Sequence, residues 1–350
     1  MNALRSAKAI RQSSIISVKT EPIMGKASFN AQLFRLHLTY DQQESECPHS
    51  LVAKLPTSNA DLHENATVFQ PGRKETWFYK YGASHTPIHT PRCYYNSLDP
   101  ITGASILLLE DLAPAQNGNQ LDGTSISTAK LALESAARLH AAWWGKEHVR
   151  AMLSSDGVAN NSVAAENLVQ QLFLEAWPRF VARSKDRIPD NVCQFGEYLT
   201  HRVSGLSSLL DNSPKTLIHG DFRLDNMLFG KSDGDTRCWI IDWEDIDFGN
   251  GPYDVAWFIG GCLDIGSSSE EQDLLEFYYD RLVREGVTEY AWPECQRDYC
   301  YAMSDAFVQG VLMATGDKTD STYHTQLADV IGRRFVRACD RLRLNRYVDM

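Results

Sequence analysis

The sequence predicts an α+β fold of two lobes, in which a small β-rich lobe precedes a larger, mainly helical lobe. The first hundred residues are mostly short segments rich in β-branched and aromatic residues, with turn signals between them. After Leu112, apolar residues recur at helical spacing, and two short apolar strands interrupt this helical part. A chain of 350 residues is long enough for two lobes around a cleft, and we expect their boundary near residue 112, between 1–111 and 112–350.

The β-rich lobe is expected to contain five strands and one helix. The helix, Gly72–Tyr81, lies between the third and the fourth strand. The strands are predicted at Ser14–Ile23, Ala31–Tyr40, His49–Leu55, Arg92–Asn96 and Ser105–Glu110.

The helical lobe follows a turn-rich stretch, Ala113–Ser127, and its first helix is predicted at Thr128–Trp144. We expect Trp143 and Trp144 at the end of that helix to pack in the core. Further helices are predicted at Leu168–Arg183 and Gly196–Leu210, and the two short strands at Thr216–His219 and Cys238–Asp242.

Composition excludes several classes of function. Hydrophobic residues make up 43% and charged residues 23%, as in ordinary globular proteins. A net charge of -11 argues against a nucleic-acid partner, which would favour a basic surface. No apolar run approaches the roughly 20 residues of a membrane-spanning helix, so we expect no membrane partner. Eight cysteines without a CxxC pair indicate reduced thiols in a cytoplasmic protein and not a zinc site.

The N-terminus allows two interpretations. The first 20 residues carry Arg5, Lys8, Arg11 and Lys19, with no acid before Glu21. This pattern is found in organelle transit peptides. We favour a basic, frayed start that leads into the first strand, which leaves the cytoplasm as the expected location.

The clearest chemical signal is the segment His219–Asn226, with the sequence HGDFRLDN. An apolar strand ends there in a loop that delivers Asp221 and, five residues later, Asn226; a second strand places Asp242 sixteen residues beyond. Phosphoryl transfer needs a carboxylate that accepts the proton of the attacking hydroxyl, and oxygen ligands that hold Mg²⁺ against the phosphates. An Asx turn at Asp221 and an ordinary strand end at Asp242 would explain each residue singly, but not their joint spacing.

A matching lysine and glutamate lie upstream. Lys54 stands on the strand Leu51–Leu55, placed like the strand lysine that pairs with the α- and β-phosphates in kinases. Glu75 lies on the following helix and could pair with Lys54. Either residue alone would be interpreted as a solvated surface charge, but their order ahead of the Asp221 loop favours a nucleotide site.

These motifs resemble the kinase-like phosphotransferases that include aminoglycoside phosphotransferases, choline kinases and, nearest to this sequence, the ecdysteroid-kinase-like group. The resemblance runs from about residue 20 to about residue 340 and implies a bilobal protein-kinase-like fold that uses ATP and Mg²⁺. It makes Asp221 the catalytic base and His219 the residue that shapes the catalytic loop. It makes Asn226 and Asp242 the magnesium ligands.

The same resemblance implies residues for the nucleotide. Lys54 would bind the phosphates, and Glu75 would orient Lys54. The stretch LLLEDL resembles the hinge of kinases, where backbone groups of Glu110 and Leu112 would hydrogen-bond the adenine.

Two assignments depart from the pattern of protein kinases. The phosphate-covering loop, Met24–Asn30, has one glycine where protein kinases have several, so its backbone would need help from Ser28. Arg223 lies two residues after Asp221, where a cation could stabilise the transferring phosphate. A solvated loop arginine is the alternative for Arg223.

The expected function is ATP-dependent phosphorylation of a hydroxyl group on a small molecule. An amino alcohol, an aminoglycoside-like compound, a steroid and a hydroxyacyl thioester all remain open as the acceptor. A non-catalytic nucleotide-binding pseudokinase is the alternative, and the intact lysine and metal ligands argue against it. A protein kinase is disfavoured on two grounds. The segment after Asp242 is interpreted as lacking the DFG and APE motifs of protein kinases, and only about ten residues separate Asp242 from Pro252, too few for an activation segment and peptide platform.

Three further acids lie in the helical lobe. Asp254 opens the helix after Pro252, where a first-turn acid is common, and the resemblance makes it a structural carboxylate. Asp298 and Asp305 lie on a late helix where acids for a substrate could sit, but nothing in the sequence selects either one.

Overall fold

The computed structural model divides the chain into two compact units. It describes residues 1–23, 31–42, 44–45, 47–56, 71–158, 163–184, 187–210, 212–231, 234–316 and 322–346. The first unit comprises Met1–Gln116, Leu153–Val158 and Leu228–Ile246, and the second comprises Asn117–Met152, Ala159–Met227 and Asp247–Met350.

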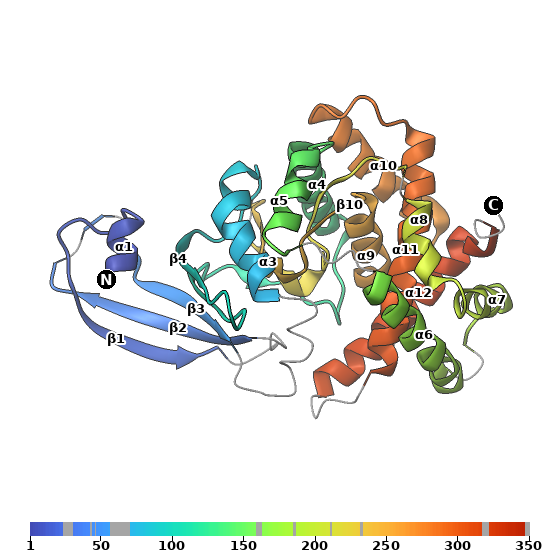
Figure 1. The fold of residues 1–350 in the computed structure, drawn as a ribbon, viewed down its shortest axis with the longest axis horizontal. Helices are drawn as coiled ribbons and strands as arrows, with labels where there is room; N and C mark the ends of the chain where they lie inside the picture. Colours follow the sequence, from blue (N-terminus) through green and yellow to red (C-terminus); the bar gives the residue numbers. More distant parts are fainter. Residues whose placement is uncertain are drawn as a thin grey trace. The chain divides into compact units, whose positions relative to one another are not determined.

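The first unit is built on an antiparallel sheet with the strand order β1-β2-β3-β5-β4 (Figure 1). The five strands are β1 (Ile15–Pro22), β2 (Ala31–Tyr40), β3 (Ser50–Pro56), β4 (Cys93–Leu98) and β5 (Ser105–Glu110). All five lie where the sequence predicts them. Lys54 on the central strand β3 pairs with Leu33 on one side and Leu107 on the other, which buries this part of the sheet.

The N-terminal segment is packed, so the expectation of a frayed start is wrong. A short helix α1 (Asn2–Ser6) leads into a buried cluster that includes Leu4, Ile10 and Leu51. The carboxylate of Glu44 accepts backbone N–H groups of three consecutive residues, Arg11, Gln12 and Ser13, at 2.9, 2.8 and 2.5 Å. The hydroxyl of Ser13 also donates to this carboxylate, and its bond together with the backbone bonds lowers the pKa of Glu44 to about 2. Apolar burial and one carboxylate therefore hold the segment in place.

The predicted helix of the first unit is present. It begins as α3 (Pro71–Trp77), continues as a π-helical turn η2 (Phe78–Gly82) and ends in a short 3₁₀ turn η3 (Ala83–His85). The ring of Phe78 stacks on Trp243 with centroids 3.6 Å apart and an angle of 7° between the planes. Both rings are fully buried, so this helix is fixed to the segment that carries Asp242.

Five short strands complete the sheets. The strands β6 (Gln116–Asn117), β8 (Met227–Phe229) and β9 (Cys238–Ile240) form one small sheet, while β7 (Thr216–Ile218) pairs antiparallel with β10 (Asp247–Gly249). The two strands predicted before Asp221 and Asp242 are β7 and β9. Sequence reasoning did not predict β6, β8 or β10. The interpretation that no DFG follows Asp242 is wrong, because β10 has the letters DFG of the metal motif of protein kinases.

Helices make up most of the second unit, as the α+β prediction requires (Figure 1). They are α4 (Ile126–Trp143), α5 (Glu147–Ser155), α6 (Val163–Ser184), α7 (Asp190–Leu199), η4 (Val203–Gly205), α8 (Leu206–Leu209), η5 (Leu224–Asn226), α9 (Pro252–Cys262), α10 (Ser268–Arg284), α11 (Trp292–Thr315), α12 (Thr322–Leu342) and η7 (Leu344–Arg346). A 3₁₀ turn η6 (Trp243–Asp245) belongs to the first unit.

One predicted helix is wrong. The pattern over Gly196–Leu210 belongs to the end of α7, a turn, and the short helices η4 and α8. The hydroxyl of Thr200 donates to the carbonyl of Glu197 at 2.6 Å, where a continuing helix would place a backbone N–H. The helix α7 thus ends where the Thr200 hydroxyl competes with a backbone N–H for the carbonyl of Glu197.

Helix α9 is the centre of the second unit. Almost every residue of α9 is buried, which is expected of a helix that is apolar on all sides. It packs against α11 and α12. In the described residues, no helix has the length and apolar character needed to cross a membrane.

Candidate active site

A buried lysine gathers three carboxylates in the first unit. The Nζ of Lys54 lies 2.7 Å from Oε2 of Glu75, 2.5 Å from Oδ1 of Asp242 and 2.7 Å from Oε1 of Glu244. The lysine side chain is 9% exposed and that of Glu75 is 2% exposed. The predicted ion pair between Lys54 and Glu75 is therefore present, and it is part of a larger cluster that also holds Asp242.

Burial and charge shape the protonation of this cluster. Burial disfavours the charged form of Lys54, but the charges of Asp242 and Glu75 outweigh it and hold the pKa of Lys54 well above its usual value. Burial also raises the pKa of Glu75 to about 7, which the Lys54 charge only partly offsets. The lysine stays charged, whereas Glu75 can take up a proton near neutral pH.

The same acids could hold a divalent cation. One carboxylate oxygen from each of Glu75, Asp242 and Glu244 lies within 4.8 Å of the others. Carboxylate oxygens are the ligands that Mg²⁺ prefers. Asp242 adopts the left-handed backbone conformation, with φ 67° and ψ 64°, which is uncommon outside glycine and typical of strained functional positions.

The predicted hinge begins at the end of β5. The backbone N–H of Glu110 donates to the carbonyl of Arg92, so any contact of Glu110 with adenine would use its carbonyl. Asp111 accepts a hydrogen bond from Nε of Arg35 and one from the hydroxyl of Ser50, both at 2.7 Å. Burial opposes the charge on Asp111, but these bonds outweigh it and lower its pKa. The sequence analysis did not predict these bonds of Arg35 and Ser50 to Asp111.

Of the other residues predicted to bind the nucleotide, the structure describes Leu112 but not Ser28. The carbonyl of Leu112 accepts a hydrogen bond from the N–H of Ala115, which forms a tight turn after the hinge. Ser28 and the phosphate-covering loop, 24–30, lie outside the described residues.

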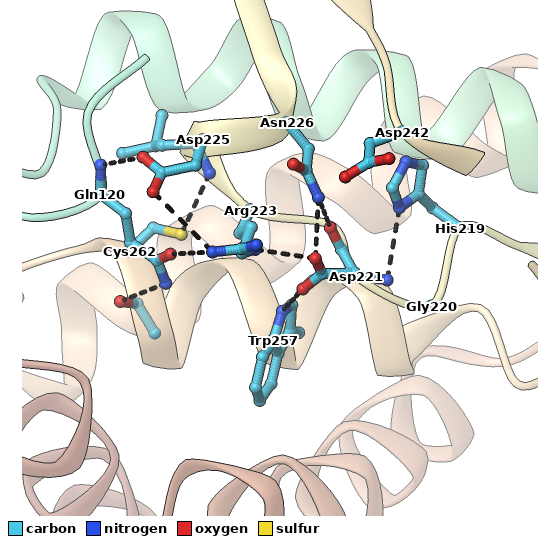
Figure 2. A network of polar contacts seen from close by, with 12 residues as sticks. Gln120, His219, Gly220, Asp221, Arg223, Asp225, Asn226, Asp242, Trp257 and Cys262 are labelled. Carbon is cyan, nitrogen blue, oxygen red and sulfur yellow. Dashed lines mark hydrogen bonds and ion pairs between the residues drawn. The ribbon is translucent and has the colours of Figure 1, made fainter. Parts of the chain in front are cut away.

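Asp221 is the centre of a polar network in the second unit (Figure 2). Its Oδ2 accepts hydrogen bonds from Nε of Arg223 at 2.7 Å and from Nδ2 of Asn226 at 2.8 Å. Its Oδ1 accepts one from the indole N–H of Trp257 at 3.0 Å. The side chain of Asp221 is 19% exposed, so it is held in place and still open to a reactant.

The amide of Asn226 has a fixed orientation. Its Nδ2 donates to both the backbone carbonyl and the carboxylate of Asp221, at 2.9 and 2.8 Å. Because both bonds use the nitrogen, the amide oxygen is the atom that can serve a metal ion. The backbone N–H of Asn226 donates to the carbonyl of Arg223, which closes the 3₁₀ turn η5.

Arg223 is bound into this network, and its alternative interpretation as a solvated loop residue is wrong. Besides Asp221, its guanidinium lies 3.5 Å from Oε1 of Gln120 and 3.8 Å from Oδ2 of Asp225. The side chain is 16% exposed. Asp225 in turn accepts from the backbone of Gln120 at 2.8 Å and from the hydroxyl of Tyr323 at 2.6 Å. Two acids thus share one arginine.

A buried carboxylate holds the loop that carries Asp221. Asp254, fully buried at the start of α9, accepts the backbone N–H groups of His219 at 2.7 Å and Gly220 at 2.9 Å. The loop can turn there because Gly220 has a φ of 84°, which suits glycine. The ring of His219 accepts the N–H of Asp221 at 3.3 Å. Asp254 is the structural carboxylate that the resemblance implied.

A second histidine extends this support and was missed from the sequence. The Nε2 of His140 on α4 lies 3.1 Å from Asp254, and its Nδ1 lies 2.9 Å from the hydroxyl of Tyr278 on α10. The backbone carbonyl of His140 accepts the hydroxyl of Thr216 on β7. All these side chains are fully buried. Side chains of α4, α9 and α10, together with the strand β7, therefore hold the Asp221 loop in place.

The model of the ecdysteroid kinase-like family matches residues 26–287, well over half of the chain. The chain belongs to this family. As a member, it is a phosphotransferase of the kinase type that acts on an alcohol group, so the superfamily predicted from the sequence is confirmed. No curated protein matches the chain significantly in sequence.

Solved structures share the fold of this ecdysteroid kinase-like chain. Ethanolamine kinase from Plasmodium vivax matches 96% of this chain and 85% of its own, with 14% identity and a TM-score of 0.53. Aminoglycoside 2'-phosphotransferase-IIIa in its GDP complex matches 97% and 100%, with 14% identity and a TM-score of 0.53. Amicoumacin kinase in complex with AMP-PNP, Ca²⁺ and Ami matches 96% and 93%, with 12% identity and a TM-score of 0.51. The predicted kinase-like fold is thereby confirmed.

The two late acids of this family member differ from each other. Asp298 is fully buried and accepts hydrogen bonds from Arg297, Tyr290 and the side chain of Asn250, so it is a structural group and not a substrate acid. Burial raises the pKa of Asp305 to about 6, against a hydrogen bond from Gln309.

The predicted site residues fall into two sets. The first unit contains Lys54, Glu75, Glu110, Leu112 and Asp242, of which Lys54, Glu75 and Asp242 are in direct contact. The second unit contains His219, Asp221, Arg223 and Asn226, which form one bonded loop. The contact of Glu244 with Lys54 was not predicted, although the position of Glu244 two residues after Asp242 was a usable signal. Sequence reasoning also missed Trp257, which follows Asp254 by nearly one helical turn.

Proposed function

We propose that this protein transfers the γ-phosphate of ATP to a hydroxyl group of a small molecule. In this proposal, residues 1–111 bind the nucleotide and residues 112–350 supply catalysis and the acceptor site. The observation that carries it is the buried contact of Lys54 with both Glu75 and Asp242, because a lysine so held suits the phosphates of a nucleotide beside a metal ligand.

Each site residue has a proposed role in the transfer. Asp221 accepts the proton of the acceptor hydroxyl while the hydroxyl oxygen bonds to the γ-phosphorus. The bond from that phosphorus to the bridging oxygen breaks, and ADP leaves. Arg223 offers positive charge near the transferring group, and His219 shapes the loop. General-base assistance of this kind contributes on the order of 10² to 10⁴ in rate.

The nucleotide and the metal have proposed sites of their own. Glu75 orients Lys54, which binds the phosphates, and the backbone groups of Glu110 and Leu112 bind the adenine. Ser28 would contribute at the phosphate-covering loop. Mg²⁺ would neutralise phosphate charge when bound. The AMP-PNP and Ca²⁺ of the amicoumacin kinase complex support a nucleotide with a divalent cation.

Asn226 and Asp242 are the proposed ligands of that Mg²⁺. Each offers a side-chain oxygen, and the orientation of the Asn226 amide supports this use of its oxygen.

The acceptor is proposed as an amino alcohol, an aminoglycoside-like compound, a steroid or a hydroxyacyl thioester. The ethanolamine kinase and the aminoglycoside phosphotransferase among the similar structures support the first two. The family name supports the third. We keep the cytoplasm as the proposed location, because the eight cysteines, all among the described residues, form no disulfide.

A panel of hydroxyl compounds with ATP or GTP and Mg²⁺, read by release of the nucleoside diphosphate, tests the proposal. We expect turnover of at least one compound, and its loss in Asp221→Ala with nucleotide affinity within a few-fold of wild type. The exposed Asp273 on α10 provides a matched control, Asp273→Ala, which should keep full activity. A variant Asp221→Ala that retains more than about a tenth of the wild-type rate would contradict the assigned base.

A further inference from the structure

The carboxylate of Asp221 has an asymmetric set of contacts. A carboxylate offers about four lone-pair sites, two on each oxygen. Among the described residues, Oδ2 uses both of its sites for Arg223 and Asn226, whereas Oδ1 receives only the indole N–H of Trp257 (Figure 2). The free site on Asp221 therefore lies on Oδ1, beside Trp257.

Trp257 has little freedom to move. It is 4% exposed on α9, and its ring packs on Phe335 of α12 with centroids 5.3 Å apart. A methyl group at Gly310 would lie 2.3 Å from the Phe335 ring, and one at Gly260 would lie 2.8 Å from it. These close contacts with α9 and α11 hold the ring of Phe335 in place, and that ring in turn packs against the indole of Trp257. The direction of the indole N–H is thus set by the core of the second unit.

We infer that Trp257 is a positioning residue, which orients Asp221 so that Oδ1 faces the acceptor hydroxyl. The inference rests on the proposed function of Asp221 as the base. In the transfer, the hydroxyl proton moves to the remaining site on Oδ1 as the oxygen bonds to the γ-phosphorus and ADP departs. Proton transfer depends first on geometry, and Trp257 together with Arg223 stops the carboxylate from rotating about its last bond.

Packing alone would explain a buried tryptophan, but not the partner of its N–H. A buried indole N–H needs an acceptor. Trp243 satisfies this need with a nearby backbone carbonyl, that of Ile240 at 3.2 Å. Trp257 instead directs its N–H to the proposed base, 36 residues away in the chain. The indole thus links the packed core directly to the reacting group.

The variant Trp257→Phe removes the N–H and keeps an aromatic ring. Because a hydrogen bond to a charged group is lost, we expect kcat to fall by about tenfold to a hundredfold, while the KM for ATP stays within about twofold. The matched control is Trp177→Phe. Trp177 is equally buried in the same unit and donates its N–H to a carboxylate, that of Glu197 at 3.1 Å, so the control should lose stability but not kcat.

A second replacement keeps the test decisive if Trp257→Phe folds poorly. Incorporation of β-(3-benzothienyl)alanine at position 257 preserves the shape of the ring and replaces the N–H by sulfur. We expect the same loss of kcat with an unchanged melting temperature. In the Asp221→Ala background, Trp257→Phe should change the single-turnover rate by less than about twofold, since residues that act as a unit are non-additive.

The outcomes separate this inference from the proposed function. A kcat within about twofold of wild type in both replacements at position 257 would overturn the positioning role, as would equal losses of kcat in Trp257→Phe and Trp177→Phe. If Asp221→Ala stays active, the proposed base fails instead. An inactive Asp221→Ala together with a normal Trp257→Phe would refute the positioning role alone.

Discussion

The replacement of Lys54 by methionine removes the ammonium group that contacts Glu75, Asp242 and Glu244. Their oxygens lie within 4.8 Å of one another. At that separation two unit charges repel by about 3.5 kcal/mol if the effective dielectric constant is about 20. Burial already raises the pKa of Glu75 to about 7, so protonation of Glu75 would relieve part of the repulsion among the three carboxylates. We expect Lys54→Met to lose about 3–5 kcal/mol of unfolding free energy near neutral pH, as is usual when one partner of a buried pair is removed.

Urea denaturation with and without MgCl₂ measures this effect. A divalent cation that binds the folded state at 100 times its dissociation constant would restore about 2.7 kcal/mol. The control is Lys19→Met on the exposed strand β1 of the same sheet, which should change the unfolding free energy by less than about 0.5 kcal/mol. A variant Lys54→Met within about 1 kcal/mol of wild type in the absence of divalent cations would refute the idea that Lys54 holds these acids together.

Two further predictions concern the same cluster. Glu75 has a folded-state pKa of about 7, raised from 4.5 by burial, so the stability it contributes is present below pH 4.5 and is lost as the pH rises to 7. The unfolding free energy of the wild type should therefore fall by about 3 kcal/mol relative to Glu75→Gln over that range, as urea denaturation at several pH values can show. Asp242→Asn should abolish Mg²⁺-dependent ATP binding, because it removes an anionic ligand. A Mg²⁺ titration of nucleotide binding measures this, and unchanged dependence would assign the ion to Glu244.

Much of this fold could be predicted because its signals are local. The strand β2 alternates apolar with polar residues over much of its length, and β5 is an apolar run between turn residues; both were predicted at their observed bounds. Such patterns and the turns beside them act within a few residues, so no tertiary information is needed. The pairing of Lys54 with Glu75 was also predictable, because the central strand and the helix after it can present only a few charged residues to each other.

The features that were missed depend on contacts between distant residues. Glu44 accepts N–H groups more than thirty residues before it, and nothing near Glu44 in the sequence signals this. Trp257 is one of several tryptophans in apolar surroundings, and only the packing of α9 against α12 shows that its N–H reaches Asp221. The helix predicted over Gly196–Leu210 failed for the opposite reason, since a local side-chain contact of Thr200 outweighed the apolar spacing.

The strand β10 bears on the kind of acceptor. In protein kinases the aspartate of the DFG motif is itself a metal ligand, and the segment after it extends into a loop that orders a peptide. Here the same three letters, at Asp247–Gly249, are paired residue by residue with Ile218, Leu217 and Thr216 of β7, the strand that ends at the Asp221 loop. Helix α9 begins at Pro252, three residues after β10 ends, and its acid Asp254 binds the loop. The residues after Asp242 therefore pair with β7 and bind the Asp221 loop, where a protein kinase would form a peptide platform. This use of the segment favours a small acceptor.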